Sequence, residues 1–499
     1  VSAEVVDPRT QTTVYAVSAD GKGIEYAQGS IDEVTDQLRE QLGEAMQNVQ
    51  KTSVPLPNVA TPSLDALKAF AVARNIANTT GDREQALGLY RRALQLDPQF
   101  ALAHVDMARL HASLGEVAVA KQAWRKALAI PQRLSTQEKL GVELMLMQHD
   151  APGPYFRKAQ EYVALYPDDY RTIARLATNQ WHQRNDFHAA EALIRRTLKP
   201  QFERAAFSRN TLGNYLLGQE NYEAAFAEYR AARKAGFSAW AEYYARAYDV
   251  RGEHAEADKV YLASTGGRDG WKNDAAVVTW IDRGDWGRAG EAAGAWAAKA
   301  DTDADVLSGL RARAAIASVA VLSGKGDGVR AMRDLQVAVD AKGEEADQLY
   351  PPTGTELRLY IGLLAAYRGD AAGVADALKR TQDSPVLRDF PTVTQLQQIV
   401  LAEQERLAGR PQEAMARLAP MVKQDTALVA VHWALMRAAQ AAGDEPVASA
   451  QRRWLATHRG RVFTEATTTE VLRFFNVAVS AQALKVAPDR SPAGSATAN

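Results

Sequence analysis

Hydrophobic and small residues recur at a fixed spacing in the first third of the chain, with polar residues between them. A glycine, two alanines and an aromatic residue repeat after 34 residues, at Gly81, Ala86, Tyr90 and Ala93 and again at Gly115, Ala120, Trp124 and Ala127. A constant period of this length is typical of stacked helical hairpins, whose apolar faces are buried only against neighbouring hairpins. The pattern therefore predicts a helical repeat array.

The small residue of the second helix can be followed through most of the chain. It continues as Ala190, Ala225, Ala257, Ala289, Ala331, Ala375, Ala414 and Ala448. A turn signal precedes all of them except Ala225, usually glycine or asparagine followed by an acidic residue, because glycine adopts a positive φ at little conformational cost. We expect about eleven hairpins in residues 64–460 from this period.

The segment from Ala108 to Ala127 resembles the tetratricopeptide repeat family. The matching residues are Ala108 and Leu110 in one helix, Gly115-Glu116 at the turn, and Ala120, Trp124 and Ala127 in the next helix. The resemblance implies an all-α, right-handed solenoid. It also implies a module that binds other proteins or peptides and is not itself an enzyme.

Both ends of the chain depart from the repeat. Residues 2–7 and 12–18 are rich in Val, Thr and Tyr and predict two β-strands, followed by a helix from Ser30 to about Gln50. We expect residues 1–50 to be a truncated α/β segment, whose unpaired strands favour self-association. The remaining segments are a proline-rich linker at 51–63, a C-terminal capping helix at 461–486 and a disordered tail at 487–499.

Two stretches interrupt the array. Residues 264–274 are rich in glycine and polar residues, and residues 343–355 contain a Pro-Pro pair. Both patterns predict longer loops between helices.

The junction before the repeats carries a second resemblance. Leu42-Gly43-Glu44, residues 55–57 (PLP) and residues 60–70 (ATPSLDALKAF) are similar to a junction in large bacterial signalling proteins. In those proteins a nucleotide cyclase or serine/threonine kinase head precedes an α/β segment and a repeat array. The nearest likeness is the repeat region of the cyclase of a bacterial peptide-modification system. The resemblance implies a bacterial source and a signalling role.

Composition removes several classes of function. The net charge is -1 over 499 residues and no basic run stands out, so nucleic acid is not an expected partner. The absence of cysteine excludes thiol catalysis, cysteine-ligated zinc and disulfides. No apolar stretch approaches the roughly 18 residues needed to cross a bilayer. A cysteine-free chain suits both the periplasm and the cytoplasm of a bacterium, so both compartments stay open.

We expect no catalytic residue, metal site or cofactor. The sequence contains no phosphate-binding loop, zinc-protease motif or nucleophile elbow. The glycine cluster at 324–328 is assigned to a turn between helices because no strand precedes it. His104 and His111 share a helix face but lie two turns, about 10 Å, apart, which is too far for one metal ion.

Polar residues on the first helices of three consecutive hairpins form the candidate site. The family resemblance implies that these helices line the concave surface. The groove-facing residues are then Arg175, Asn179, His182, Asn210, Asn214, Glu242 and Arg246. Amide side chains can pair with a peptide backbone, and arginine can hold a carboxylate in a fork. We expect these side chains to face water in the free protein and to bind an extended peptide. A merely solvated polar face explains the same residues.

The sequence thus favours a non-enzymatic scaffold or sensor module of a bacterial signalling protein. The alternative is the regulatory C-terminal half of a nucleotide cyclase or serine/threonine kinase whose catalytic head lies outside this chain. A third hypothesis, a glycan-binding or glycan-processing helical protein, rests only on the nine tryptophans. Several of these, Trp124, Trp286, Trp296 and Trp433, fall at helical core spacings, which favours packing.

Overall fold

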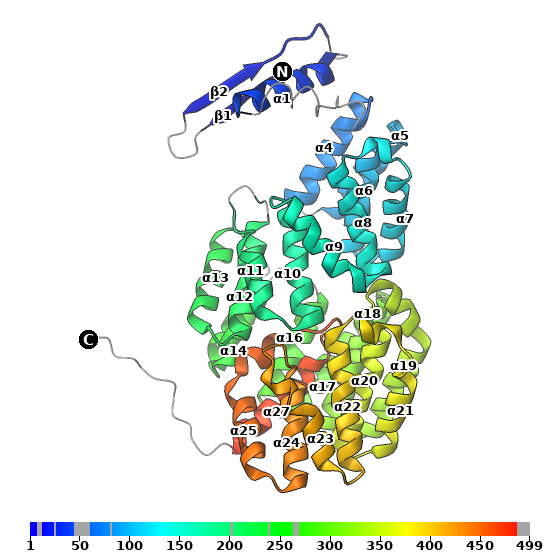
Figure 1. The fold of residues 1–499 in the computed structure, drawn as a ribbon, viewed down its shortest axis with the longest axis vertical. Helices are drawn as coiled ribbons and strands as arrows, with labels where there is room; N and C mark the ends of the chain where they lie inside the picture. The colour runs from blue at the N-terminus through cyan, green and yellow to red at the C-terminus, as the bar shows by residue number, and fades with distance from the viewer. Residues whose placement is uncertain are drawn as a thin grey trace, which may run out of the picture. The chain divides into compact units, whose positions relative to one another are not determined.

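In a computed structural model the chain forms two compact units, the N-terminal unit Val1–Ala151 and the C-terminal unit Pro152–Asn499. The structure describes residues 1–6, 12–23, 26–43, 60–79, 82–199, 202, 204–237, 240–262 and 269–486. Within these ranges the chain is an all-α solenoid of paired helices with one two-stranded sheet at its start (Figure 1). The predicted tail at 487–499 and most of the predicted linker at 51–63 lie outside the described residues.

The N-terminal unit begins with the predicted strand pair. Strands β1 (Ser2–Val6) and β2 (Thr13–Ser18) run antiparallel, with Ser2 opposite Ser18. Helix α1 (Ala27–Gln41) contacts β2, and Gln28 on α1 donates a 2.8 Å hydrogen bond to the carbonyl oxygen of Thr61. The predicted strands are confirmed. The helix begins three residues before the expected Ser30, and residues 44–50 of its predicted end are not described.

The rest of the N-terminal unit is built from paired helices. They are α4 (Leu64–Thr79), α5 (Arg83–Leu96), α6 (Ala101–Ser113), α7 (Val117–Leu128) and α8 (Thr136–Asp150), with a short 3-10 turn, η2 (Pro131–Arg133). Ala86 and Ala120 are fully buried, and the side chains of Tyr90 and Trp124 fill the core one turn further on. Alanine lets the helix backbones approach, and the aromatic ring restores close packing between hairpins. The repeat positions are therefore confirmed.

The C-terminal unit continues the array. Its repeat helices are α9 (Pro152–Leu165), α10 (Tyr170–Arg184), α11 (Phe187–Arg195), α12 (Ala205–Gly218), α13 (Tyr222–Lys234), α14 (Trp240–Val250), α15 (His254–Leu262), α16 (Asp269–Asp282), α17 (Trp286–Thr302), α18 (Val306–Leu322), α19 (Gly328–Leu349), α20 (Thr353–Arg368), α21 (Ala371–Thr381), α22 (Pro391–Leu407), α23 (Pro411–Leu418), α24 (Val429–Ala442) and α25 (Glu445–Thr457). Two 3-10 turns, η3 (Pro385–Arg388) and η4 (Met421–Lys423), precede α22 and α24. Consecutive helices pair within each unit, as α4–α5 and α6–α7 in the N-terminal unit and as α10–α11 through α24–α25 in the C-terminal unit.

The turn signals have a simple local geometry. Gly443 ends α24 with φ +76°, and the side chain of Asp444 accepts a 3.2 Å hydrogen bond from the Val447 N–H at the start of α25. Asn185 takes the place of glycine after α10 with φ +55°. Glycine adopts this left-handed conformation readily and asparagine tolerates it, while aspartate satisfies a free N–H of the next helix. Two residues therefore end one helix and start the next.

The hairpins of the C-terminal unit close into a ring. Helix α10 contacts α22, and Asn185 Nδ2 donates hydrogen bonds to the carbonyl oxygens of Thr426 at 3.3 Å and Ala427 at 3.0 Å. The first of these bonds joins residues 241 positions apart in the sequence. Each hairpin is rotated slightly against the previous one, and the accumulated rotation returns the array to its own beginning.

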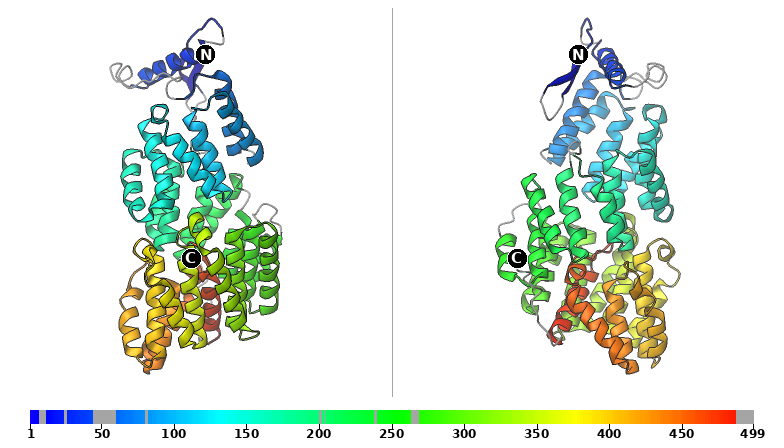
Figure 2. Two further views of the ribbon diagram at one scale, coloured as in Figure 1. Left: turned by 90° about the vertical axis from the view of Figure 1, so that its right-hand side faces the viewer. Right: turned by 60° about the vertical axis from the view of Figure 1, so that its left-hand side comes forward.

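Residues 459–486, called the C-terminal segment below, lie inside this ring. They form α26 (Arg459–Thr464) and α27 (Leu472–Val486). Helix α26 contacts α12 and α14, and α27 contacts α16, α18, α24 and α25. In both views of Figure 2 the red segment lies between green and yellow hairpins. Phe463, Phe474 and Phe475 are almost completely buried, so the segment supplies part of the core of the ring.

The prediction of a single capping helix is wrong, because two helices form in its place. The helix is interrupted after Thr464, where the hydroxyls of Thr467 and Thr469 donate to the buried carboxylate of Glu356 on α20. Threonine hydroxyls that bond outside a helix compete with helix formation. The segment does contact α24 and α25, as a cap would, but it also contacts the inner helices of earlier hairpins.

Helices occupy part of both predicted loops. Helix α16 starts at Asp269, inside the first predicted loop, and residues 263–268 are not described. Helix α19 continues to Leu349, so only residues 350–352 separate it from α20. Glutamate and alanine at 344–346 favour a helix, and the chain meets proline, which breaks one, only at Pro351.

Candidate functional site

The seven residues predicted to line the groove lie on α10, α12 and α14. Helices α12 and α14 contact α26, and Trp181 on α10 donates a 3.0 Å hydrogen bond to the Thr464 carbonyl of the C-terminal segment. Arg175 and His182 are half-buried, and the buried members are Asn179, Asn210, Asn214, Glu242 and Arg246. The expectation that all seven face water is wrong, because the C-terminal segment occupies the interior of the ring. Their role in binding a peptide stays a prediction.

Several of these residues have hydrogen-bond or ion-pair partners on the repeat helices themselves. Asn214 Oδ1 accepts a 2.8 Å hydrogen bond from the hydroxyl of Tyr229 on α13. Arg246 pairs with Glu242 one turn earlier on the same helix, at 3.2 Å. Burial raises the pKa of Glu242 to about 7, against the opposing effect of Arg246. These contacts therefore stabilise the repeat helices of the ring.

Charged side chains of the C-terminal segment pair with charges on α16 and α18. The pairs are Arg459–Asp282 at 2.6 Å, Glu470–Arg311 at 2.7 Å and Arg473–Asp274 at 2.8 Å. Burial disfavours the charged form of Glu470, but the neighbouring Arg473 and Arg311 outweigh it and lower the pKa of this carboxyl. Each of these charged side chains of the segment pairs with an opposite charge. The ion pairs therefore determine the orientation of the segment within the ring.

The ring also holds the main chain of the segment. Glu220, at the turn after α12, accepts hydrogen bonds from the backbone N–H groups of Gly460 and Arg461, both at 2.9 Å. Glu465 on the segment accepts a 2.8 Å bond from the backbone N–H of Val429 and a 2.7 Å bond from Asn476 Nδ2. Burial raises the pKa of Glu465 to about 7. Polar groups of the repeat helices therefore bind polypeptide directly.

A polar cleft lies at the seam where the ring closes. We call it the seam cleft; it is lined by His188, Gly218–Glu220, Val422–Asp425, Ala427, His432, Trp454, His458 and Arg461. Its volume is about 460 Å³. Pockets for small ligands measure roughly 300 to 1,000 Å³, so the cleft has the size of a small organic molecule.

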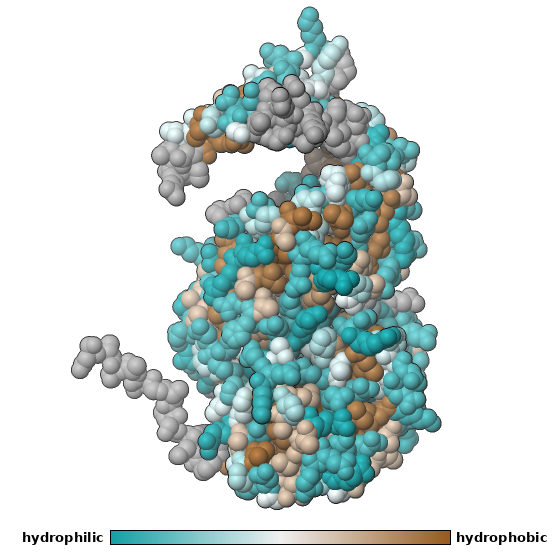
Figure 3. Space-filling view, viewed as in Figure 1, coloured by the Kyte–Doolittle hydropathy of each residue, from teal (hydrophilic) through white to brown (hydrophobic). Residues whose placement is uncertain are grey.

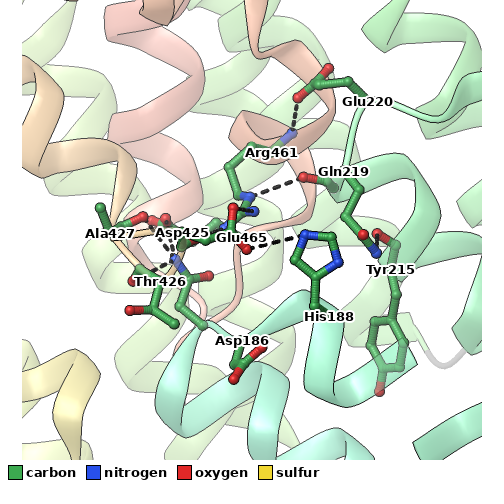
Figure 4. Close-up of polar contacts among 12 residues, drawn as sticks. Asp186, His188, Tyr215, Gln219, Glu220, Asp425, Thr426, Ala427, Arg461 and Glu465 are labelled. Carbon is green, nitrogen blue, oxygen red and sulfur yellow. Dashed lines mark hydrogen bonds and ion pairs between the residues drawn. The ribbon is translucent and has the colours of Figure 1, made fainter. Parts of the chain in front are cut away.

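Arg461 links the two sides of the seam cleft. Its Nε donates to the carbonyl oxygen of Gly218 and its Nη1 to the carbonyl oxygen of Asp425, both at 2.9 Å. Figure 4 shows Arg461 and His188 directed toward the loop that carries Asp425. His188 Nε2 lies 3.5 Å from the Asp425 carboxylate. The cleft is thus built on contacts between α11, α12, the loop before α24, and α26.

Aromatic rings form another side of the cleft. Trp454 stacks with His432 at 3.4 Å between centroids and an interplanar angle of 4°, and with His458 at 4.3 Å and 12°. Burial lowers the pKa of His432 to about 4, and Gln451 Oε1 lies 2.7 Å from its Nδ1. His432 is therefore a neutral structural group near pH 7.

The seam cleft could not be predicted from the sequence. Residues 218 and 461, which meet through the Arg461 side chain, are 243 positions apart. No repeat position or motif marks either of them. In the part of the chain that the structure describes, no group of three or more histidine, aspartate or glutamate side chains could hold a metal ion.

Comparison with known proteins gives no family assignment. No family model matches the chain, and no curated protein matches it. The TPR domain of P58(IPK) aligns at 12% identity over 85% of this chain and 100% of that chain, with a TM-score of 0.20. A structure of Naa15/Naa10 bound to HypK-THB aligns at 14% identity over 93% of this chain and 80% of that chain, with a TM-score of 0.23. The description as a solenoid therefore rests on the hairpins themselves.

Proposed function

We propose that this chain is a non-enzymatic scaffold that binds a protein or peptide partner. The supporting observation is that the inner helices already bind polypeptide, namely the C-terminal segment. Glu220 accepts hydrogen bonds from two of its backbone N–H groups, and Trp181 donates to one of its carbonyl groups. Three ion pairs hold its charged side chains. Main-chain hydrogen bonds provide affinity, and the charged pairs provide specificity.

The predicted groove residues can bind a partner only under one condition. A partner peptide would reach Asn179, Asn210 and Asn214 only after the C-terminal segment had left the ring. Withdrawal would expose aromatic side chains such as Phe474 and Phe475, each worth about 1.5 to 3 kcal/mol of burial. A partner that binds there must therefore bring apolar side chains of its own as well as backbone groups.

The wider setting follows the sequence resemblance. We propose a module of a bacterial signalling protein, with the regulatory half of a nucleotide cyclase or serine/threonine kinase as the alternative. These two hypotheses are distinguished by what the native gene encodes upstream of codon 1. A cyclase or kinase domain encoded there supports the alternative, whereas a start codon or signal peptide immediately before Val1 contradicts it.

The surface of the C-terminal unit offers no simpler explanation. Over the described residues of the face in Figure 3, hydrophilic residues dominate and hydrophobic ones form only small patches. No described helix is long and apolar enough to cross a membrane. A surface of this kind suits polar recognition of a partner more than a broad apolar interface.

The experiment for the scaffold proposal is affinity capture with the full chain, followed by calorimetry on the purified partner. Saturable binding at a defined stoichiometry supports the proposal. The proposal is contradicted if bare resin captures the same protein equally well and calorimetry shows no binding of that protein to the chain. Self-association through the strands is tested by sedimentation, because β1 and β2 each have one unpaired edge in the two-stranded sheet. A constant monomer mass up to about 100 μM contradicts self-association.

A further inference from the structure

The C-terminal segment has the composition of a bound partner. Its buried side chains include arginines and phenylalanines, namely Arg459, Arg461, Phe463, Arg473, Phe474 and Phe475. Arginine is almost never fully buried inside a single domain unless it is paired, whereas arginine and aromatic residues are enriched in interfaces between separate polypeptides. The contact between the segment and the ring therefore resembles an interface between two chains more than a continuous core.

Several polar atoms at this contact are not fully paired. Asp274 Oδ1, Asn476 Oδ1 and the Nε atoms of Arg311 and Arg473 are buried and make no hydrogen bond among the described residues. A buried polar atom without a partner opposes burial, because it has given up its hydrogen bond to water. The segment is thus held less tightly than its buried apolar area alone implies.

The segment begins at a single residue outside the helices. Helix α25 ends at Thr457 and α26 begins at Arg459, so only His458 separates them. His458 also lines the seam cleft. Because residues at the ends of helices absorb the backbone rotation in hinge movements, a rotation at His458 would move the segment as a unit and leave α25 in place.

Glu356 on α20, Arg311 on α18 and Asp274 on α16 bind the middle of the segment. The pairs are Thr469–Glu356 at 2.6 Å, Glu470–Arg311 at 2.7 Å and Arg473–Asp274 at 2.8 Å. Arg311 also lies 3.8 Å from Asp274, so the groups of the ring that bind the acidic and the basic side chain adjoin each other. A polypeptide matches these groups if it carries a hydroxyl residue, a glutamate directly after it, and an arginine three residues after the glutamate.

We propose that the C-terminal segment is a releasable internal ligand of the ring, and that its release opens the site to a partner polypeptide with the same pattern of hydroxyl residue, glutamate and arginine. The inference rests on the proposed scaffold function, since it names the class of partner and the step that controls its binding. A polypeptide without this charge pattern fits poorly, because it would leave Arg311 and Asp274 buried without the partners that the segment provides.

The attached segment lowers the apparent affinity of the ring for any free partner. A ligand on a short tether stays at an effective concentration on the order of millimolar. A free peptide binds only the fraction of molecules whose ring is open, and its apparent dissociation constant rises by the inverse of that fraction. While most rings stay closed, a substitution that weakens only the attached segment should therefore tighten the binding of a free peptide by the same factor.

The first experiment is native-state hydrogen exchange of the full wild-type chain at increasing urea concentrations. We expect the amide groups of α26 and α27 to exchange together through an opening that leaves α12 and α18 protected, at least about tenfold faster than the amides of those helices. Exchange of the segment and the ring through one global unfolding step overturns the proposal, because the segment is then an inseparable part of the core. This measurement needs no substitution, so it decides the question even if a variant fails to fold.

The second experiment measures, by fluorescence anisotropy, the binding of a labelled peptide with the sequence of residues 459–486 to the full chain. The chain variants are Thr469→Val and Glu470→Gln, which keep the shape of the attached segment and leave the ring unchanged. Lys485→Ala, at an exposed position near the end of α27, is the matched control. A second peptide that carries Arg473→Glu tests whether the site requires the arginine.

We expect the two variants to bind the first peptide at least about tenfold more tightly than the wild-type chain and the control do, the factor that corresponds to one lost buried hydrogen bond or charged contact. The peptide with Arg473→Glu should bind these variants at least about tenfold more weakly than the first peptide. Equal affinity of all four proteins for the first peptide, or no binding to any of them, overturns the proposal, and so does equal affinity of the two peptides.

The two proposals fail through different results. If the peptide does not bind but a captured partner still binds the wild-type chain saturably, the scaffold proposal holds and only the releasable segment is overturned. If the peptide binds the variants but no protein partner binds the full chain, the scaffold proposal fails and the segment is a switch without the partner inferred for it.

Discussion

Arg473 in the C-terminal segment and Asp274 at the inner side of α16 form a buried ion pair, with 2.8 Å between Nη1 and Oδ2. Their side chains are only 2% and 4% exposed. Asp274 raises the pKa of the Arg473 guanidinium together with Glu470, against the effect of burial. The pair links α27 to α16, in the middle of the ring.

Removal of one partner should destabilise the C-terminal unit strongly. Arg473→Ala leaves the buried Asp274 with only the longer contact to Arg311, 3.8 Å away, and the loss of one partner of a buried ion pair typically costs about 3 to 5 kcal/mol. Arg330→Ala on α19, which breaks an exposed pair with Asp334, is the control and should cost less than about 1 kcal/mol. Urea denaturation measures both. Similar midpoints for the two variants would show that the segment does not depend on this pair.

Asn214 provides a test of burial at the predicted groove. Asn214→Ala should cost about 1 to 3 kcal/mol, because the hydroxyl of Tyr229 loses its acceptor in a buried site. Adding Tyr229→Phe should recover part of this loss, since the unsatisfied hydroxyl is then gone. Thermal unfolding of the single and double variants measures the difference. A single variant as stable as wild type would mean that Asn214 faces water, as the sequence alone suggested.

Ala120 tests the repeat register in the N-terminal unit. Ala120→Trp inserts a large ring into a fully buried position and should cost about 1 to 3 kcal/mol or more. Ala118→Trp, at an exposed position of the same helix α7, is the matched control. Because repeats couple to their neighbours, the first variant should also show an earlier melting step. Identical melting curves for the two variants would mean that the register is wrong.

Glu465 should give the ring a defined pH dependence. Burial raises its pKa from 4.5 to about 7 in the folded state. The folded protein therefore binds this proton more tightly than the unfolded chain, and the contribution of Glu465 to stability falls as the pH rises from about 4.5 to about 7. Glu465→Gln removes the titration but keeps an acceptor for the N–H of Val429.

The measurement is the free energy of unfolding of wild type minus that of Glu465→Gln, from denaturation at several pH values. The difference should decrease between about pH 4.5 and 7 and be level outside that window. Other buried carboxylates, such as Glu242, titrate in both proteins and cancel. A difference that stays constant across this window would show that the pKa of Glu465 in the folded protein is not raised into it.

The sequence by itself determined the local architecture. Ala86, Ala120, Tyr90 and Trp124 occupy the core positions that their period predicted, and the glycine–acid signals end and start helices as expected. These features depend on residues within one hairpin or its neighbour, so a pattern of about 34 residues contains the information needed to find them. The two strands at the N-terminus follow from local composition in the same way.

Only the tertiary structure decided what fills the ring and where a site can form. Small rotations between hairpins add up until α10 meets α22, and no single repeat in the sequence records their sum. The amphipathic pattern of residues 461–486 showed that the helix must bury one face, but not that the face would be the interior of the ring. Arg473 and Asp274 are 199 positions apart, and Gly218 and Arg461 are 243 apart. Polar residues on inner helices look alike in sequence whether they meet water, a partner or the chain's own C-terminal segment, because only the closed ring determines which of these lies opposite them.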